Sequence, residues 1–160
     1  MSEDWTAPGA RQRRDILART RSVAIVGASP NPSRASNFVS TYLVAESDYD
    51  LYFINPTEQE ILGRATYPSL AALPVVPDLV DVFRRPAALG EVMDQAIAVG
   101  AGTYWAQLGL FDPEVARAGV AAGMTVVMNR CVKIEHARFS GGLHLAGFNT
   151  GVISSRRARR

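Results

Sequence analysis

Residues 22–36 place the strongest constraint on what this chain can fold into. Their sequence is SVAIVGASPNPSRAS, and the run from Val23 to Val26 has the length and composition of a strand that is buried on both faces. The run ends at Gly27, a loop of small residues, prolines and one arginine follows, and helical periodicity begins after the loop. The helical residues that share one apolar face are Phe38, Val39, Tyr42 and Leu43. This order of strand, loop and helix opens a doubly wound nucleotide-binding fold, in which loop N–H groups and the helix N-terminus meet a pyrophosphate.

The loop differs from the fingerprint of dinucleotide-binding proteins. G-x-G-x-x-G would require glycine where this chain has Ser29 and Pro32. NAD proteins also carry an acid at the end of the second strand to hold the ribose, and here that position is Asn55. The sequence therefore predicts a nucleotide ligand but disfavours a nicotinamide cofactor.

Strands alternate with helices along most of the chain. Apolar runs predict strands at 22–26, 51–55, 79–84, 103–107 and 125–128, and helical spacing predicts helices at 9–20, 36–45, 87–99 and 113–122. Gly100 is the expected C-cap of the third helix and Asp112 the N-cap of the fourth. Between the second and third strands we expect only short elements, with Ser69 as the N-cap of one helical turn.

This alternation implies a parallel sheet with right-handed crossovers. We therefore predict a single doubly wound α/β domain with a parallel sheet of about five strands, a size that 160 residues can build. The chain divides into an N-terminal basic helix (1–21), the folded domain (22–139) and a C-terminal extension with a basic tail (140–160).

The net charge of +2 comes from the two ends of the chain. Residues 1–21 hold five arginines against three acids, residues 156–160 hold four arginines, and the body between them is mildly acidic. A basic tail without interleaved aromatic residues makes nucleic-acid binding through Arg156, Arg157, Arg159 and Arg160 a weak alternative.

We expect a cytoplasmic protein that does not enter a membrane. The N-terminus lacks an apolar leader, and no segment approaches the uninterrupted apolar length of a membrane span. The single cysteine, Cys131, excludes an internal disulfide and suits a reducing compartment. Its thiol is either a small buried apolar group or a partner for thiol exchange with a ligand.

Ligands of doubly wound sheets bind beyond the carboxyl ends of the strands. That rule selects the loop at 27–36, Asn55-Pro56, Arg84-Arg85, Gln107 and the segment 129–131, a set that suits an anionic, phosphorylated ligand. Structural roles remain open for some of these residues, because glycine can serve a tight turn and asparagine can cap one.

The sequence offers no obvious catalytic group. The histidines, His136 and His144, have no partner at metal-ligand spacing, and Glu135 and His136 are neighbours that would point apart on a helix. A nucleophile elbow and a P-loop lysine are both absent, and Lys133 is the only lysine. We assign no catalytic residue and no metal ligand.

Several uncommon strings in a fixed order resemble a known family. They are VAIVGASPNPSR (23–34), INP (54–56), ILGRATYPSLAALP (61–74), DLVDVFRRP (78–86), AQLGL (106–110) and VVMNRCVKIEHARF (126–139). In these strings the chain resembles small stand-alone coenzyme A-binding proteins, whose domain is similar to the N-terminal CoA-binding domain of the succinyl-CoA synthetase alpha subunit. The resemblance runs from about Arg21 to Phe139.

The resemblance implies a Rossmann-like fold with CoA or acyl-CoA across the strand carboxyl ends. It implies that Gly27, Ala28, Ser29 and Arg34 handle the phosphates. It further implies that the adenosine and pantetheine path is lined by Asn55, Pro56, Phe83, Arg84, Gln107 and Asn129. The catalytic histidine and the nucleotide-grasp domain of the synthetases are absent from the chain, so binding without catalysis is expected.

Three roles fit a CoA-binding protein of this kind: buffering CoA, sensing acyl-CoA, or acting as a subunit beside a protein partner or a second copy. The alternative from the enzyme class is an NAD(P)-dependent oxidoreductase, against which the missing second glycine and the missing acid both count.

Overall fold

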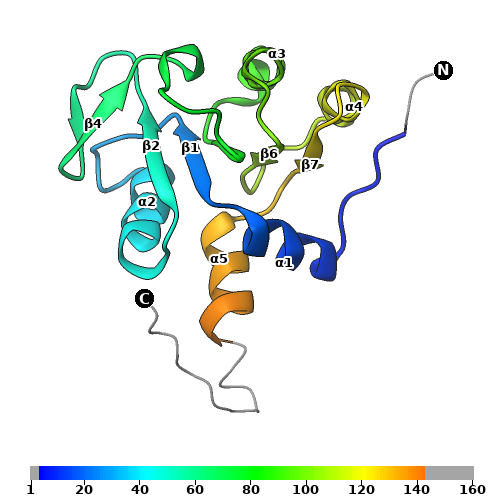
Figure 1. Cartoon of the computed structure of the whole chain (residues 1–160), viewed down its shortest axis with the longest axis horizontal. Helices are drawn as coiled ribbons and strands as arrows, with labels where there is room; N and C mark the ends of the chain where they lie inside the picture. Colours follow the sequence, from blue (N-terminus) through cyan, green and yellow to red (C-terminus); the bar gives the residue numbers. More distant parts are fainter. Residues whose placement is uncertain (1–3, 143–160) are drawn as a thin grey trace.

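The computed structural model describes residues 4–142, which build one sheet of seven strands with helices on both faces (Figure 1). The strand order is β3-β4-β2-β1-β5-β6-β7, with β3 antiparallel to β4 and every other pair parallel. The strands are β1 (Ser22–Val26), β2 (Asp50–Ile54), β3 (Glu60–Ile61), β4 (Arg64–Tyr67), β5 (Leu79–Val82), β6 (Thr103–Ala106) and β7 (Thr125–Val127). The predicted α/β class is confirmed.

The sheet is larger than the predicted five strands. The additional pair, β3 and β4, is a short hairpin within the segment that was expected to hold only short elements. Leu62 and Gly63 turn it with positive φ angles of 51° and 77°. β3 (EI) and β4 (RATY) contain charged and polar residues and bury only Ile61, so they lack the continuous apolar runs by which the other strands are predicted. The predicted strand at 79–84 ends earlier, at Val82.

All four predicted helices are present, and a fifth is added. They are α1 (Ala10–Arg19), α2 (Ala35–Glu46), α3 (Leu89–Val99), α4 (Pro113–Ala121) and α5 (Val132–Ala137), with short helical turns η1 (Leu70–Ala72), η2 (Pro86–Ala88) and η3 (Arg138–Gly142). Gly100 ends α3 in the left-handed conformation, and the Asp112 carboxylate accepts hydrogen bonds from the first turn of α4. Ser69 precedes η1, but its side chain makes no capping hydrogen bond.

Alternate residues of the central strands face two different apolar cores. Val80, Val82 and Tyr104 pack with α3 and α4 on one face, whereas Leu79 and Trp105 pack with α1, α2 and α5 on the other (Figure 1). Because both faces are covered, the central strands contain few positions that reach solvent.

The buried face of α2 differs from the predicted one. Val39 and Leu43 are buried as expected, but Phe38 is 62% exposed, and Ser36, Asn37 and Ser40 take the remaining inward positions. Small residues at the inward positions let a helix lie close to a sheet. Phe38 therefore projects outward, on the side of α2 that faces α5.

The N-terminal helix is joined to the domain by a buried ion pair. Arg13 of α1 donates from Nε to Oε1 of Glu135 in α5 over 2.7 Å, and the side chains are only 6% and 3% exposed. Ile16 and Leu17 of α1 are buried in the core of the same face. The predicted C-terminal extension lies outside the described residues from residue 143 onward, together with His144 and the arginines of the tail.

Candidate functional site

The carboxyl ends of the parallel strands meet at one edge of the sheet, where the strand order changes direction between β1 and β5. β1 leads into α2 on one face, while β5 leads through η2 into α3 on the other (Figure 1). In open α/β sheets this switch point is where ligands bind. The predicted site residues follow β1, β2, β5, β6 and β7, so the topology gathers all of them at this edge.

Gly27 allows the loop after β1 to pass directly against the backbone of the neighbouring strand. Its φ is +89°, and a Cβ at this position would collide with the carbonyl oxygen of Phe83. The Phe83 N–H donates to the Val26 carbonyl over 2.9 Å, which holds the two backbones together. Glycine is therefore required here by the packing of two strands, in addition to any role toward a ligand.

Local hydrogen bonds order the loop between Gly27 and α2. The Asn31 N–H donates to Ser29 Oγ over 3.0 Å, and Asn31 Oδ1 accepts from the Ser33 N–H over 2.9 Å. The Arg34 N–H then donates to the Asn31 carbonyl, and α2 begins at the next residue. The Arg34 side chain is exposed and forms no salt bridge with any residue of the described range.

Two asparagines tie this loop to its surroundings. Asn55 Nδ2 donates to the Ala28 carbonyl over 2.9 Å, and Asn37 Nδ2 donates to the Ser29 carbonyl over 3.0 Å. Asn37 is buried in the first turn of α2 and was not among the predicted site residues. A polar residue on the inward face of a helix next to a glycine loop is the sequence signal that points to it.

The ordered loop leaves backbone donors free. Among the hydrogen bonds within residues 4–142, none uses the N–H groups of Ala28, Ser29, Ala35 or Ser36. The first turn of α2 carries no acid, so its positive end is not neutralised locally. Free N–H groups beside a helix N-terminus are the arrangement that accepts a phosphate in nucleotide-binding loops.

Asn55 also caps the turn after β2. Its Oδ1 accepts hydrogen bonds from the N–H groups of Thr57 and Glu58 at 2.8 and 2.9 Å and from the Thr57 hydroxyl. Pro56 beside it is exposed. The side chain that replaces the acid of NAD proteins thus holds two loops together at the edge of the sheet.

Gln107 and Asn129 join the loops after β6 and β7. Gln107 is buried and accepts from the Val132 N–H at 3.2 Å, while Asn129, with a φ of +61°, accepts from the Gly109 N–H at 2.7 Å. Both contacts use the amide oxygens. The donors Nε2 of Gln107 and Nδ2 of Asn129 make no hydrogen bond within residues 4–142.

The remaining predicted residues differ in their burial. Phe83 is half-buried and packs against the core beneath α2, whereas Arg84 and Arg85 are both exposed. Cys131 is a free thiol, half-buried at the margin of the same core, just before α5. The edge therefore carries exposed guanidinium groups next to the loop with free N–H donors.

Asp81 of β5 is a buried acid close to this edge that the sequence analysis did not single out. It is 0% exposed, and neither carboxylate oxygen has a hydrogen-bond partner among the described residues. Burial raises the pKa of Asp81 well above its ordinary value. The side chain points to the α2 side of the sheet, between Ile25 and Trp105 of the adjacent strands.

His136 is a structural residue between helices. Its Nδ1 lies 2.8 Å from the Tyr42 hydroxyl, and the rings of Tyr42 and Tyr49 contact the imidazole edge to face. Burial lowers the pKa of His136, while Glu46 and Asp48 oppose that shift. His136 and its neighbour Glu135 have different partners, Tyr42 and Arg13 respectively.

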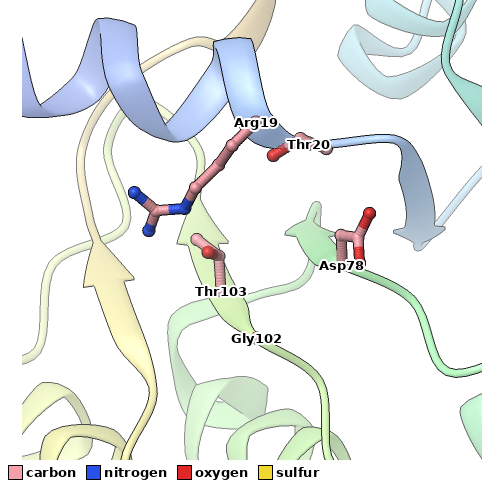
Figure 2. Close-up of a pocket in the computed structure, with 5 residues that line it drawn as sticks. All are labelled: Arg19, Thr20, Asp78, Gly102 and Thr103. Atoms are coloured by element: carbon pink, nitrogen blue, oxygen red, sulfur yellow. The ribbon is translucent and has the colours of Figure 1, made fainter.

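A cavity of about 190 Å³ lies at the opposite, amino-terminal edge of the sheet (Figure 2). Its lining includes Asp78, whose Oδ2 accepts from the N–H groups of Arg21 and Ser22, and Thr20, whose hydroxyl donates to a carbonyl of α1. These polar groups are used to start β1 and to end α1. The cavity is therefore explained by the packing of element ends.

Within residues 4–142 no helix is long and apolar enough to cross a membrane, and no group of three or more His, Cys, Asp or Glu side chains is arranged to hold a metal ion.

Solved structures resemble this fold closely. A hypothetical protein from Pyrococcus horikoshii OT3 is 37% identical with a TM-score of 0.80, covering 87% of this chain and 99% of its own. A Thermus thermophilus protein is 34% identical with a TM-score of 0.77, covering 82% and 99%. The dinucleotide-forming acetyl-coenzyme A synthetase 1 of Ca. Korarchaeum cryptofilum shares the fold alone, at 24% identity and a TM-score of 0.64, over 72% of this chain and 27% of the synthetase.

Sequence comparison identifies the family. The YneT protein of Bacillus subtilis (strain 168), described as uncharacterized, is 35% identical over 130 residues, which cover 81% of this chain and 96% of YneT. The family model described as "CoA binding domain" matches residues 21–137, from the residue before β1 to the end of α5. This chain belongs to the CoA-binding domain family.

Proposed function

We propose that the protein binds coenzyme A or an acyl-CoA across the carboxyl edge of the sheet, with the phosphates at the loop from Gly27 to Arg34. The observation that carries this proposal is the set of free N–H groups in an ordered loop at the N-terminus of α2. Membership of the CoA-binding domain family supports the choice of ligand.

The proposed phosphate contacts are Gly27, Ala28, Ser29 and Arg34. The loop presents its backbone there, and the Arg34 guanidinium is free to form charge-assisted hydrogen bonds. The proposed adenosine and pantetheine path is lined by Asn55, Pro56, Phe83, Arg84, Gln107 and Asn129. Asn55, Gln107 and Asn129 also hold the loops in place through their amide oxygens.

We propose that binding occurs without catalysis by this chain. Asp81 is enclosed and reaches no surface, and the imidazole of His136 is enclosed by two tyrosine rings. Neither residue can touch a ligand at the edge of the sheet in this arrangement.

The proposal is tested by calorimetry with CoA, dephospho-CoA, NAD and ADP in parallel. CoA is expected to bind well and NAD poorly, because the ribose-binding acid is replaced by Asn55, whose oxygen is occupied. Equal affinity for CoA and NAD would favour the NAD(P)-dependent oxidoreductase instead, and no binding of CoA would refute the proposal.

The substitution Arg34→Ala tests the phosphate contact directly. It is expected to weaken CoA binding by about 1.5–3 kcal/mol, the range for hydrogen bonds to charged groups. Thermal stability should hardly change, because the side chain is exposed and unpaired among the described residues. Arg21→Ala is the matched control, since Arg21 is an exposed arginine at the amino edge, and it should leave CoA affinity unaltered. Equal affinities for the two variants would exclude Arg34 from the site.

A further inference from the structure

Lys133, the only lysine in the sequence, reaches from α5 across to α2. Its Nζ lies 4.9 Å from the centroid of the Phe38 ring and 5.2 Å from that of Tyr42. Both distances are within the range of cation–π attraction. The side chain is half-buried, so its ammonium group has a defined position between two helices.

That position is against α2, the helix that follows the proposed phosphate loop. Phe38 lies one turn into α2, and its N–H donates to the Arg34 carbonyl over 3.2 Å. Side chains on a helix lean toward its N-terminus, so the Phe38 ring lies over the turn that starts at Arg34. The Lys133 ammonium is held between this ring and that of Tyr42, one turn further along, and therefore lies beside the N-terminal half of α2.

Positive charge accumulates toward the start of α2, whereas the acid of this helix, Glu46, lies at its other end. Arg34 precedes α2, no acid occupies its first turn, and the one acid of α5, Glu135, is paired with Arg13. The salt bridges found within residues 4–142 include neither Lys133 nor Arg34. The positive N-terminal end of α2 repels Arg34 and Lys133. An anion placed between these two side chains would be attracted by both of them and by the helix end.

Building on the proposed function, we propose that Lys133 is a further ligand-binding residue whose ammonium contacts a phosphate group of CoA. Phe38 is then a positioning residue, which acts by holding Lys133. The site consequently extends from the loop after β1 to the helix after β7, and selects for ligands that carry phosphate.

Chemical labelling of the unaltered protein tests this placement. A protein chain with one lysine has two kinds of primary amine, the lysine Nζ and the N-terminal α-amino group, so the second is an internal control. Reductive methylation followed by peptide mass spectrometry should show that saturating CoA slows modification of Lys133 by about tenfold and leaves the α-amino group unprotected. Pantetheine, which lacks the phosphates, should not protect Lys133. Equal labelling of Lys133 with and without bound CoA would overturn the proposal.

Substitutions separate a direct contact from a structural role. Lys133→Met should weaken CoA binding about tenfold, the loss of one charge-assisted hydrogen bond, and reduce the salt dependence of binding. Lys133→Arg should retain most of the affinity. Phe38→Ala should weaken binding less, and should have no further effect in the Lys133→Met background, because the two residues act as one unit. Ile134→Ala, at an exposed neighbour, should change nothing.

The two proposals fail in different ways. Binding of CoA that is equally tight in the wild type and Lys133→Met refutes the role of Lys133 and leaves the proposed function intact. A wild-type protein that does not bind CoA refutes both.

Discussion

Replacing Gly27 with alanine is expected to destabilise the protein by about 2–4 kcal/mol and to abolish measurable CoA binding. The backbone at Gly27 has a φ of +89°, and an added Cβ would collide with the Phe83 carbonyl oxygen. The N–H of Phe83 is hydrogen-bonded to the Val26 carbonyl. The Phe83 carbonyl therefore cannot move without opening the pairing of β1 with β5. The loop would have to shift, and the N–H groups proposed to bind the phosphates would be displaced with it.

Gly63→Ala is the matched control for this experiment. Gly63 has a similar φ of +77°, but no atom lies within 4 Å of the position that its Cβ would occupy. Its substitution should therefore cost only the conformational penalty, about 1 kcal/mol, and leave CoA binding unchanged. Urea denaturation and calorimetry of both variants provide the comparison. If Gly27→Ala were as stable as Gly63→Ala, the close approach to Phe83 would not be a constraint.

The sequence could predict which loops make the site, because their placement follows from the order of the elements. Buried apolar runs identified five of the seven strands, and parallel strands bring their carboxyl ends together whatever side chains they carry. The same reasoning selected Gly27, although the collision that requires glycine involves Phe83, a residue that is close only in the folded chain.

The hydrogen-bond partners of the polar side chains could not be predicted in the same way. Asn55 forms a hydrogen bond with Ala28, 27 residues away, and Gln107 forms one with Val132, 25 residues away. Such pairs depend on the register of neighbouring strands, which no local pattern shows. The position of Lys133 likewise depends on α5, a helix of six residues that is too short to reveal a helical period.

The sequence predicts Asp81 only as part of a strand, because its environment depends on the order of the strands in the sheet. β5 is central, with β1 on one side and β6 on the other, and both faces of the sheet are covered by helices. A carboxyl group on such a strand has no route to water. In most proteins a buried acid is hydrogen-bonded, so the lack of a partner for its oxygens among residues 4–142 is an energetic cost that this fold carries.

The substitution Asp81→Asn is expected to make the protein more stable at pH 8, by about 1–3 kcal/mol, and to remove part of the pH dependence of its stability. Burial raises the pKa of Asp81 in the folded state above its unfolded value, so the folded state holds the proton more tightly. The stability that the protonated Asp81 contributes is fully present below the pKa of the unfolded state. It is lost as the pH rises through the pKa of the folded state. Asparagine is neutral throughout this window and has no such loss.

The measurement is the free energy of unfolding in urea between pH 6.5 and 9, for the wild type and Asp81→Asn. The lower limit of pH 6.5 keeps a second group out of the measurement. Burial lowers the pKa of His136, so His136 reduces the stability when the pH falls below the ordinary pKa of histidine, the opposite pH dependence to that of Asp81. Asp50→Asn, at an exposed position at the start of β2, is the control and should keep the wild-type slope. An unchanged free energy of unfolding at pH 8 in Asp81→Asn would mean that burial of the Asp81 carboxyl does not destabilise the fold. A loss of stability at pH 8 would mean that its carboxylate has a favourable partner, contrary to its enclosure between Ile25 and Trp105.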